Sequence, residues 1–259
     1  MKIAIAGKGG VGKTTLAGVM ARVLAEEGYR VLAVDADPDS NLASALGFPK
    51  EMVERITPLA EMTPLIEERT GAKKGVYGGI FKLNPKVDDL PDAYSISLHG
   101  VKLLILGAVP KAGGGCFCPE GVLLKSLIHY LLVRRDEVVI LDMEAGLEHL
   151  SRGSTKEVDA FIVVVEPGQR SIATALQIKR MAEDLGVERV YGVGNKVSSE
   201  EDRRLIEEGL KGIEILGHIS LNAKVIEADK RGLSPYDLDG RIREEVKGII
   251  ETLKGRHGI

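Results

Sequence analysis

The sequence predicts a single α/β domain with one doubly wound, mostly parallel β-sheet, and three observations support this. Short runs of Val, Ile and Leu with little polar alternation recur along the chain, as in strands buried on both faces of a sheet. Amphipathic helical patterns lie between several of these runs, so strands and helices alternate. The chain has 259 residues, 44% of them hydrophobic, which is enough for one large core.

The elements are expected in a regular order along the chain. Strands are expected at residues 3–6, 31–34, 102–106, 138–141, 161–165, 190–193 and 213–219. Helices are expected at 16–24, 122–133, 172–185, 225–228 and 242–253, where apolar residues recur at spacings of three and four.

The segment from about 48 to 110 departs from this alternation. It holds six of the ten prolines, and proline interrupts both helices and strand ladders. Residues 94–98 and 101–106, separated by His99 and Gly100, predict a hairpin within it. We expect residues 1–259 to form one domain, with this segment as an irregular elaboration of it.

Composition narrows the possible functions. A net charge of −3 argues against a protein built to coat nucleic acid, and no apolar run approaches the roughly 18–20 residues of a membrane span. The first residues lack the apolar core of a signal peptide, and two cysteines cannot form a disulfide framework. These features predict a cytoplasmic protein without nucleic-acid or membrane partners.

Residues 7–14 fit the pattern G-x-x-x-x-G-K-[ST] between an expected strand and an expected helix. Glycines let backbone N–H groups surround phosphate oxygens, and the helix N-terminus favours the same negative charge. Lys13 supplies a cation for the β and γ phosphates of ATP, or for the β phosphate of ADP, and Thr14 supplies a hydroxyl for Mg²⁺. The predicted nucleotide-binding residues of this loop are Gly9, Gly10, Val11, Gly12, Lys13, Thr14 and Thr15. The same stretch also spells G-x-G-x-x-G, so a dinucleotide site with Asp35 on a ribose is an alternative.

Carboxylates follow two of the expected strands. Asp35, Asp37 and Asp39 follow one, where one can position an attacking water and another can hold Mg²⁺ through its waters. Asp35 can equally cap the following turn. Asp142 ends the strand 138–141, within reach of the Mg²⁺ shell, and Glu144 next to it is either functional or a surface charge.

Two segments are expected beside the base. Asn195 and Lys196 begin an N-K-x-S sequence, in which Ser198 replaces the aspartate that recognises guanine, so ATP is favoured over GTP. The segment 219–222, before a further helix, resembles the second adenine-side segment of a superfamily of P-loop ATPases, and this resemblance implies that Leu221 lies beside adenine.

Cys116 and Cys118 flank Phe117 after three glycines and before a helix that begins near Pro119. The helix N-terminus is expected to lower the pKa of nearby thiols, and both sulfurs point the same way in an extended chain. Two thiolates are half of a tetrahedral soft-metal site, which a two-fold dimer would complete. The alternative is a pair of inert thiols.

The loop from Lys8 to Thr15 resembles the deviant Walker A loop of the MinD, ParA and nitrogenase iron protein superfamily, within the SIMIBI class of P-loop NTPases. The resemblance implies that Lys8 reaches the partner's phosphates in a homodimer. It also implies that Asp37 orients the attacking water and that Asp39 is linked to Mg²⁺. With Lys8, Lys13, Asp37 and Asp142 as catalytic residues, the expected activity is Mg²⁺-dependent ATP hydrolysis.

Together with residues 35–41, 116–118 and 141–150, this loop resembles the CooC type of nickel-insertion ATPase, which serves carbon monoxide dehydrogenase maturation. The resemblance covers nearly the whole chain. It implies that Ni²⁺ or Zn²⁺ binds between two subunits at Cys116 and Cys118. It further implies a metallochaperone that dimerises with nucleotide and metal and has carbon monoxide dehydrogenase as its client.

Three alternatives to this function remain. A MinD-like or ParA-like positioning ATPase would need a membrane-binding helix or a basic face, and the helix 242–253 has an apolar stripe without aromatic residues. An iron–sulfur electron-transfer protein would place single cysteines far apart. Acetyl-CoA synthase is an alternative client for the nickel.

Overall fold

The computed structural model describes residues 1–73, 80–108, 118–145, 150 and 155–257. Eight strands in this part of the chain form one sheet in the order β3-β4-β2-β5-β1-β6-β7-β8. The strands are β1 (Lys2–Gly7), β2 (Val31–Ala36), β3 (Ile96–Leu98), β4 (Val101–Ile105), β5 (Val138–Met143), β6 (Ala160–Val165), β7 (Val190–Val197) and β8 (Glu214–Ser220). All neighbouring strands are parallel except β3 and β4, so the predicted α/β fold with a mostly parallel sheet is confirmed.

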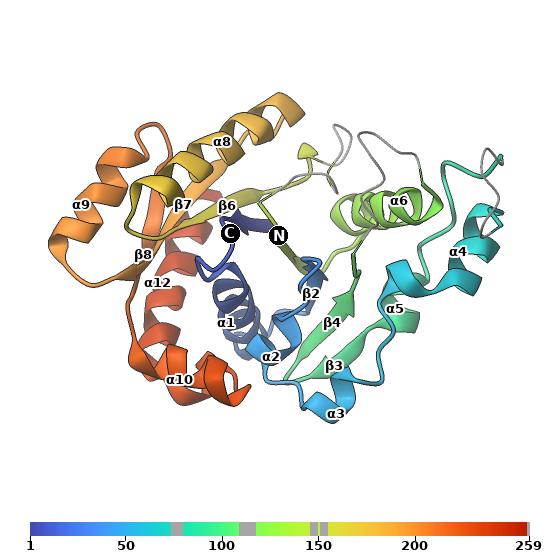
Figure 1. The fold of residues 1–259 in the computed structure, drawn as a ribbon, viewed down its shortest axis with the longest axis horizontal. Coiled ribbons are helices and arrows are strands. Elements are labelled where there is room, and N and C mark those ends of the chain that lie inside the picture. The colour runs from blue at the N-terminus through green and yellow to red at the C-terminus, as the bar shows by residue number, and fades with distance from the viewer. Residues whose placement is uncertain (74–79, 109–117, 146–149, 151–154, 258–259) are drawn as a thin grey trace.

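The helices cover both faces of this sheet (Figure 1). The longer ones are α1 (Lys13–Glu26), α6 (Pro119–Arg134), α8 (Gln169–Leu185), α9 (Glu200–Gly209), α10 (Ala223–Arg231) and α12 (Gly240–His257). The shorter ones are α2 (Leu42–Leu46), α3 (Lys50–Val53), η1 (Leu59–Glu61), α4 (Thr63–Thr70), α5 (Leu90–Tyr94) and α11 (Pro235–Leu238). The expected helices correspond to α1, α6, α8, α10 and α12.

The core consists of two apolar layers separated by the sheet. One layer lies between the sheet and α6 and α8, where Leu127 and Ile178 are buried. The other lies between the sheet and α1 and α12, where Leu16 and Val246 are buried. Strands such as β1 contribute successive residues to opposite layers, which explains why their sequences show no polar alternation.

The segment 48–110 contributes short helices and an edge hairpin to this domain. The predicted hairpin is confirmed, because β3 pairs antiparallel with β4 across a turn in which His99 has a φ of 52°. Its first strand is shorter than expected: Tyr94 ends α5, and the strand begins at Ile96. Proline in the first turn of α5 favours a helical start there, at the expense of strand length.

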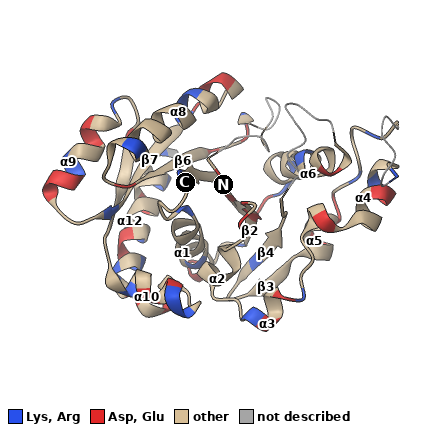
Figure 2. Ribbon diagram, viewed as in Figure 1, with Lys and Arg blue, Asp and Glu red and all other residues tan. Residues whose placement is uncertain are grey.

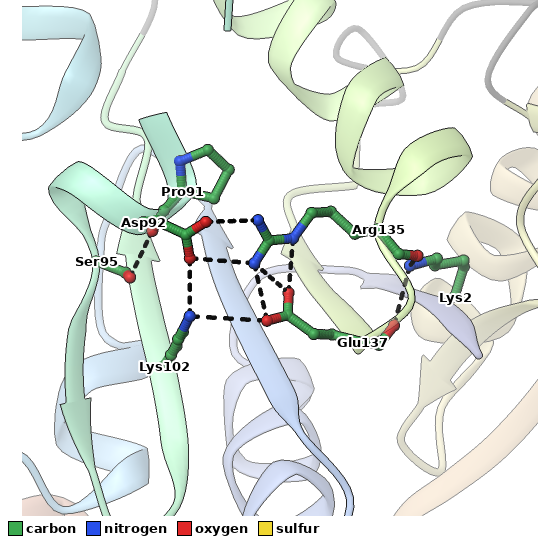
Figure 3. A network of polar contacts seen from close by, with 7 residues as sticks. All are labelled: Lys2, Pro91, Asp92, Ser95, Lys102, Arg135 and Glu137. Atoms are coloured by element: carbon green, nitrogen blue, oxygen red, sulfur yellow. Dashed lines mark hydrogen bonds and ion pairs between the residues drawn. The ribbon is translucent and has the colours of Figure 1, made fainter. Parts of the chain in front are cut away.

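An ion-pair network ties α5 to the amino ends of β4 and β5 (Figure 3). The guanidinium of Arg135 bonds both oxygens of Asp92 at 2.8 and 3.2 Å and both oxygens of Glu137 at 2.8 Å. Lys102 Nζ adds a 2.8 Å bond to Asp92. The network lies at the edge of the sheet opposite to the phosphate loop, so it fixes the scaffold away from the site.

The last long helix buries its apolar stripe against the sheet. Ile242, Val246, Ile249, Ile250 and Leu253 are each at most 1% exposed. The stripe therefore packs in the core, as its lack of aromatic residues suggested. No helix in the described ranges is both long and apolar enough to span a bilayer. Acidic and basic residues are mixed over the outer helices α8, α9 and α10 (Figure 2).

Candidate nucleotide-binding site

A pocket of about 790 Å³ opens at the carboxyl edge of the sheet, where the loops after β1, β2, β5, β7 and β8 meet. This is where ligands bind in open α/β sheets, next to the point at which the strand order reverses. The predicted residues that line it are Gly9, Gly10, Gly12, Lys13, Thr14, Thr15, Asp37, Asp39, Asn195, Lys196 and Leu221. The fold therefore brings most of the predicted site together, and Val11 lies buried just behind it.

The phosphate loop depends on glycines that adopt left-handed backbone angles. Gly10 has a φ of 78°, and Gly12, the residue before α1, has a φ of 96°. A Cβ on Gly12 would come within 2.1 Å of the Asn195 amide nitrogen, which itself donates a 2.6 Å hydrogen bond to the Val11 carbonyl. The loop is thus held in shape by a residue 184 positions away and by the Val11 N–H, which donates to the Lys8 carbonyl at 3.3 Å. The start of α1 directly after the loop favours an anion there.

Lys13 and Asp37 form an ion pair on the floor of the pocket. Lys13 Nζ lies 3.1 Å from Asp37 Oδ2, and the two side chains are only 7% and 13% exposed. Lys13 opens α1 directly after the phosphate loop, and Asp37 follows β2. Asp37 also accepts the backbone N–H of Asp39, so the turn after β2 holds its carboxylate towards the loop. In this arrangement a carboxylate takes the place that a phosphate oxygen would have beside Lys13.

Two buried carboxylates lie side by side behind this pair. Asp35 on β2 and Asp142 on β5 are register partners, and both side chains are fully buried. Asp35 accepts backbone N–H groups from Asp37 and from Leu42, which begins α2, so it stabilises the turn and the helix start. Burial raises the pKa of Asp35 to about 6, against the lowering effect of these two donors.

Asp142 lacks such donors. Neither of its oxygens accepts a hydrogen bond of normal geometry from a described residue. Burial raises its pKa to about 7, although the nearby Thr14 hydroxyl opposes this rise. A buried carboxylate without a donor, beside a threonine hydroxyl at a phosphate pocket, fits a hard divalent cation such as Mg²⁺. Asp39, exposed at the pocket mouth, fits a contact to the cation's outer waters.

The expected base side of the pocket is formed by β7 and the segment after β8. Asn195 is 7% exposed, and its Oδ1 accepts the N–H of Lys196, so part of its hydrogen-bonding capacity serves the protein itself. Leu221 is 50% exposed on the pocket wall, and its N–H bonds the Val197 carbonyl at 2.9 Å. This wall combines apolar side chains such as Val225 and Ile226 with polar ones such as Asn222, a mixture that suits a nucleotide base.

The structure adds one charged residue that the sequence reasoning missed. Glu166 lies within 3.8 Å of Lys8 and 2.9 Å of Lys196, measured from its carboxylate oxygens to the lysine Nζ atoms. Like Asp35 and Asp142, it stands at the carboxyl end of a buried strand, here β6. A carboxylate at the carboxyl end of a buried strand was therefore the sequence feature that could have identified Glu166.

Of the predicted thiols, Cys116 lies outside the described residues. Cys118 precedes α6 and accepts the N–H of Gly121 at 3.3 Å. The predicted lowering of thiol pKa is wrong for Cys118, because burial raises its pKa and outweighs the lowering effect of this N–H group. In the described part of the chain no three His, Cys, Asp or Glu side chains gather closely enough to hold a metal ion.

A strand, a glycine loop with Lys13 and Thr14, and a helix starting at that loop define a P-loop nucleotide-binding fold. Residues 2–236 match the model of the CobQ/CobB/MinD/ParA nucleotide binding domain, and the chain belongs to this family.

Relatives and solved structures agree with this assignment. The chain is 45% identical over 258 residues to the carbon monoxide dehydrogenase accessory protein CooC of Rhodospirillum rubrum, covering 100% of this chain and 98% of the relative. It is 44% identical over 256 residues to an uncharacterized ATP-binding protein of Methanocaldococcus jannaschii, covering 98% and 97% of the two chains. These similarities confirm the predicted resemblance.

Among solved structures, a plasmid partition protein of Borrelia burgdorferi bound to AMPPNP superposes with a TM-score of 0.70 at 17% identity, covering 98% of this chain and 99% of that one. The MinC:MinD cell division protein complex of Aquifex aeolicus gives a TM-score of 0.68 at 20% identity, covering 100% and 96%. These two likenesses confirm the predicted fold.

Proposed function

We propose that the chain is an ATP-hydrolysing metallochaperone, whose homodimer forms with nucleotide and metal and inserts nickel into carbon monoxide dehydrogenase. The observation that carries this proposal is the 45% identity, over the full length of both chains, with an accessory protein of that enzyme. The geometry of the phosphate pocket supports the ATPase part of it, and the two cysteines support the metal part.

Nucleotide binding would rearrange the Lys13–Asp37 ion pair. The γ-phosphate carries more negative charge than one carboxylate, so Lys13 would move from Asp37 to the phosphates. Asp37 would then be free to orient the water that attacks the γ-phosphorus, while the bond to the bridging oxygen breaks and ADP and phosphate leave. The exchange couples phosphate binding to the position of the catalytic carboxylate.

Thr14, Asp142 and, through water, Asp39 would hold Mg²⁺. Bound there, the cation would neutralise charge on the β and γ phosphate oxygens. The support for this placement is that neither Asp142 oxygen accepts a hydrogen bond of normal geometry from a described residue, while the Thr14 hydroxyl lies nearby. Asp35 does not share this role, because its oxygens already accept two backbone N–H groups.

The nickel is cargo and not a resident cofactor. Each subunit supplies Cys116 and Cys118, and a soft divalent ion bound by thiolates takes four ligands, so two subunits would complete the site. Zn²⁺ would fit the same four sulfurs. Metal affinity and nucleotide state would be linked reciprocally, because both depend on how the subunits meet.

The positioning-ATPase alternative finds less support. The two solved representatives described above share the fold at only 20% and 17% identity with this chain. The apolar stripe of α12, which would be needed at a membrane surface, is buried against the sheet and α1.

A double variant tests the proposal. Cys116→Ala with Cys118→Ala removes both thiols of the chain, so stoichiometric Ni²⁺ binding should disappear in a titration followed by native mass spectrometry. ADP binding, measured on the same protein, should stay at the wild-type value and shows that the fold is intact. Co-expressed with carbon monoxide dehydrogenase at limiting nickel, the variant should leave the enzyme inactive, and excess nickel should restore it. Wild-type Ni²⁺ affinity in the double variant would overturn the metal assignment.

A further inference from the structure

Three charged residues meet beside the phosphate loop because they belong to three neighbouring strands. Strands β1, β6 and β7 lie next to one another, with Gly7 opposite Val164 and Val165 opposite Gly194 in the register. Lys8, Glu166 and Lys196 stand at or just beyond these positions, so their side chains converge. The backbone N–H of Glu166 also lies 3.1 Å from the Ser171 hydroxyl in the first turn of α8, which fixes the start of the Glu166 side chain.

The two lysines are held unequally by the one carboxylate. Lys196 Nζ lies 2.9 Å from one oxygen of Glu166 and donates a 2.6 Å hydrogen bond to the Gly10 carbonyl. Lys8 Nζ lies 3.8 Å from the other oxygen, and its side chain is 40% exposed. Lys196 is therefore fixed at two points, whereas one long ion pair holds Lys8.

The backbone supports the same distinction. Lys196 has a φ of 57°, a conformation that a lysine adopts only when its surroundings require it. Its side chain is thereby directed back over the phosphate loop. Lys8 has no such constraint and can leave Glu166 without changing the loop.

We infer that Glu166 is a positioning residue that retains Lys8 on its own subunit while no nucleotide is bound, and that a second subunit must draw Lys8 away from it. The inference rests on the proposed dimer, in which Lys8 contacts the partner's phosphates. Lys8 must break its ion pair with Glu166 before it can contact the partner, and the cost of breaking this pair opposes dimerisation. A phosphate group of the partner's nucleotide carries more negative charge than the Glu166 carboxylate and therefore competes with it for Lys8. Glu166 thus makes subunit association depend on triphosphate.

The first test uses the nucleotide-free protein and needs no dimer. Glu166→Gln keeps the shape of the side chain and removes its charge. The rate at which an amine-acylating reagent modifies Lys8, followed by mass spectrometry, should rise about two- to fivefold, the range expected for loss of a partly exposed ion pair. Glu183→Gln is the matched control, because it removes a carboxylate 3.0 Å from Lys179 on α8, away from the pocket. It should raise the modification of Lys179 and leave Lys8 unchanged.

The second test measures association. At saturating concentrations of a non-hydrolysable ATP analogue and Mg²⁺, the dimer of Glu166→Gln should be tighter than that of the wild type. Two Lys8–Glu166 pairs break per dimer, so the expected gain is about four- to twenty-five-fold in the dissociation constant measured by sedimentation. If Glu166 only stabilised the loop, replacing it would not make the dimer tighter.

The outcomes separate the inference from the proposed function. Unchanged Lys8 modification, or an unchanged or weaker dimer in Glu166→Gln, would overturn the role of Glu166. If the wild type stays monomeric at saturating nucleotide, the proposed dimer fails, and the modification rates alone then decide whether Glu166 retains Lys8.

Discussion

Replacing Gly12 by alanine tests how the phosphate loop is held in shape. Gly12 has a φ of 96°, and an added Cβ would come within 2.1 Å of the Asn195 amide nitrogen. Asn195 is 7% exposed and cannot move aside without losing its 2.6 Å hydrogen bond to Val11. The substitution therefore combines backbone strain with the loss of a bond that supports the loop.

Both effects have known sizes. A non-glycine residue in this backbone region costs about 1–3 kcal/mol, and a lost hydrogen bond costs about 0.5–1.5 kcal/mol. Since about 1.4 kcal/mol corresponds to a tenfold change in affinity, ADP binding should weaken by at least about tenfold if the loop rearranges to relieve the contact.

Gly28→Ala separates the two effects. Gly28 has a φ of 91° after α1, and nothing lies within 4 Å of its added Cβ, so this variant carries similar backbone strain without a collision. Isothermal titration calorimetry with ADP and Mg²⁺ should show weak binding for Gly12→Ala only, while thermal unfolding should show a loss of stability in both. ADP binding by Gly12→Ala at the wild-type affinity would refute the role of Asn195 in shaping the loop.

Two further predictions concern charged residues. Asp37→Asn should leave ATP binding within a few-fold of the wild type. It should lower the rate of phosphate release at saturating ATP by about 100-fold or more, because an amide orients the attacking water poorly. A near-normal rate of ATP turnover would exclude Asp37 from catalysis. Asp92→Asn should destabilise the fold by up to about 1 kcal/mol at pH 7 in urea unfolding, since Asp92 is half exposed. Arg135 and Lys102 hold the pKa of Asp92 in the folded protein well below its usual range. The ionised Asp92 therefore contributes its full stabilisation of the fold above the pKa of Asp92 in the unfolded chain, and this contribution is lost as the pH falls through the pKa of Asp92 in the folded protein. The difference from the wild type should therefore shrink below about pH 4, and a difference independent of pH would contradict the network in Figure 3.

The fold was predictable because its strands are buried on both faces. Continuous apolar runs such as 138–141 and 161–165 are typical of central strands in an α/β chain, and both are strands in the centre of the sheet. The end of α5 was less predictable, because Tyr94 has strand propensity, whereas Pro91 in the first turn of α5 favours a helical start.

The candidate site was predictable where a motif dictates its chemistry. Lys13 and Thr14 follow from the phosphate loop, and Asp37 and Asp142 follow from the ends of neighbouring strands. Two features needed the three-dimensional structure. The Asn195 bond to Val11 spans 184 positions, and the Glu166 contacts depend on strand order, which a sequence alone does not specify.

The raised pKa of Cys118 also required the structure. The sequence indicates a helix start, which favours a thiolate, but it does not show how far the thiol is buried. Desolvation by the surrounding residues outweighs the helix N-terminus.

Molar mass in solution tests the proposed dimer most directly. Light scattering of the wild-type chain with a non-hydrolysable ATP analogue, Mg²⁺ and Ni²⁺ should give twice the monomer mass of 27.9 kDa. The Lys8→Ala variant, which still binds nucleotide through Lys13, should stay at the single-chain mass with nucleotide alone. A wild-type chain that remains at 27.9 kDa under every combination of nucleotide and metal would contradict the account.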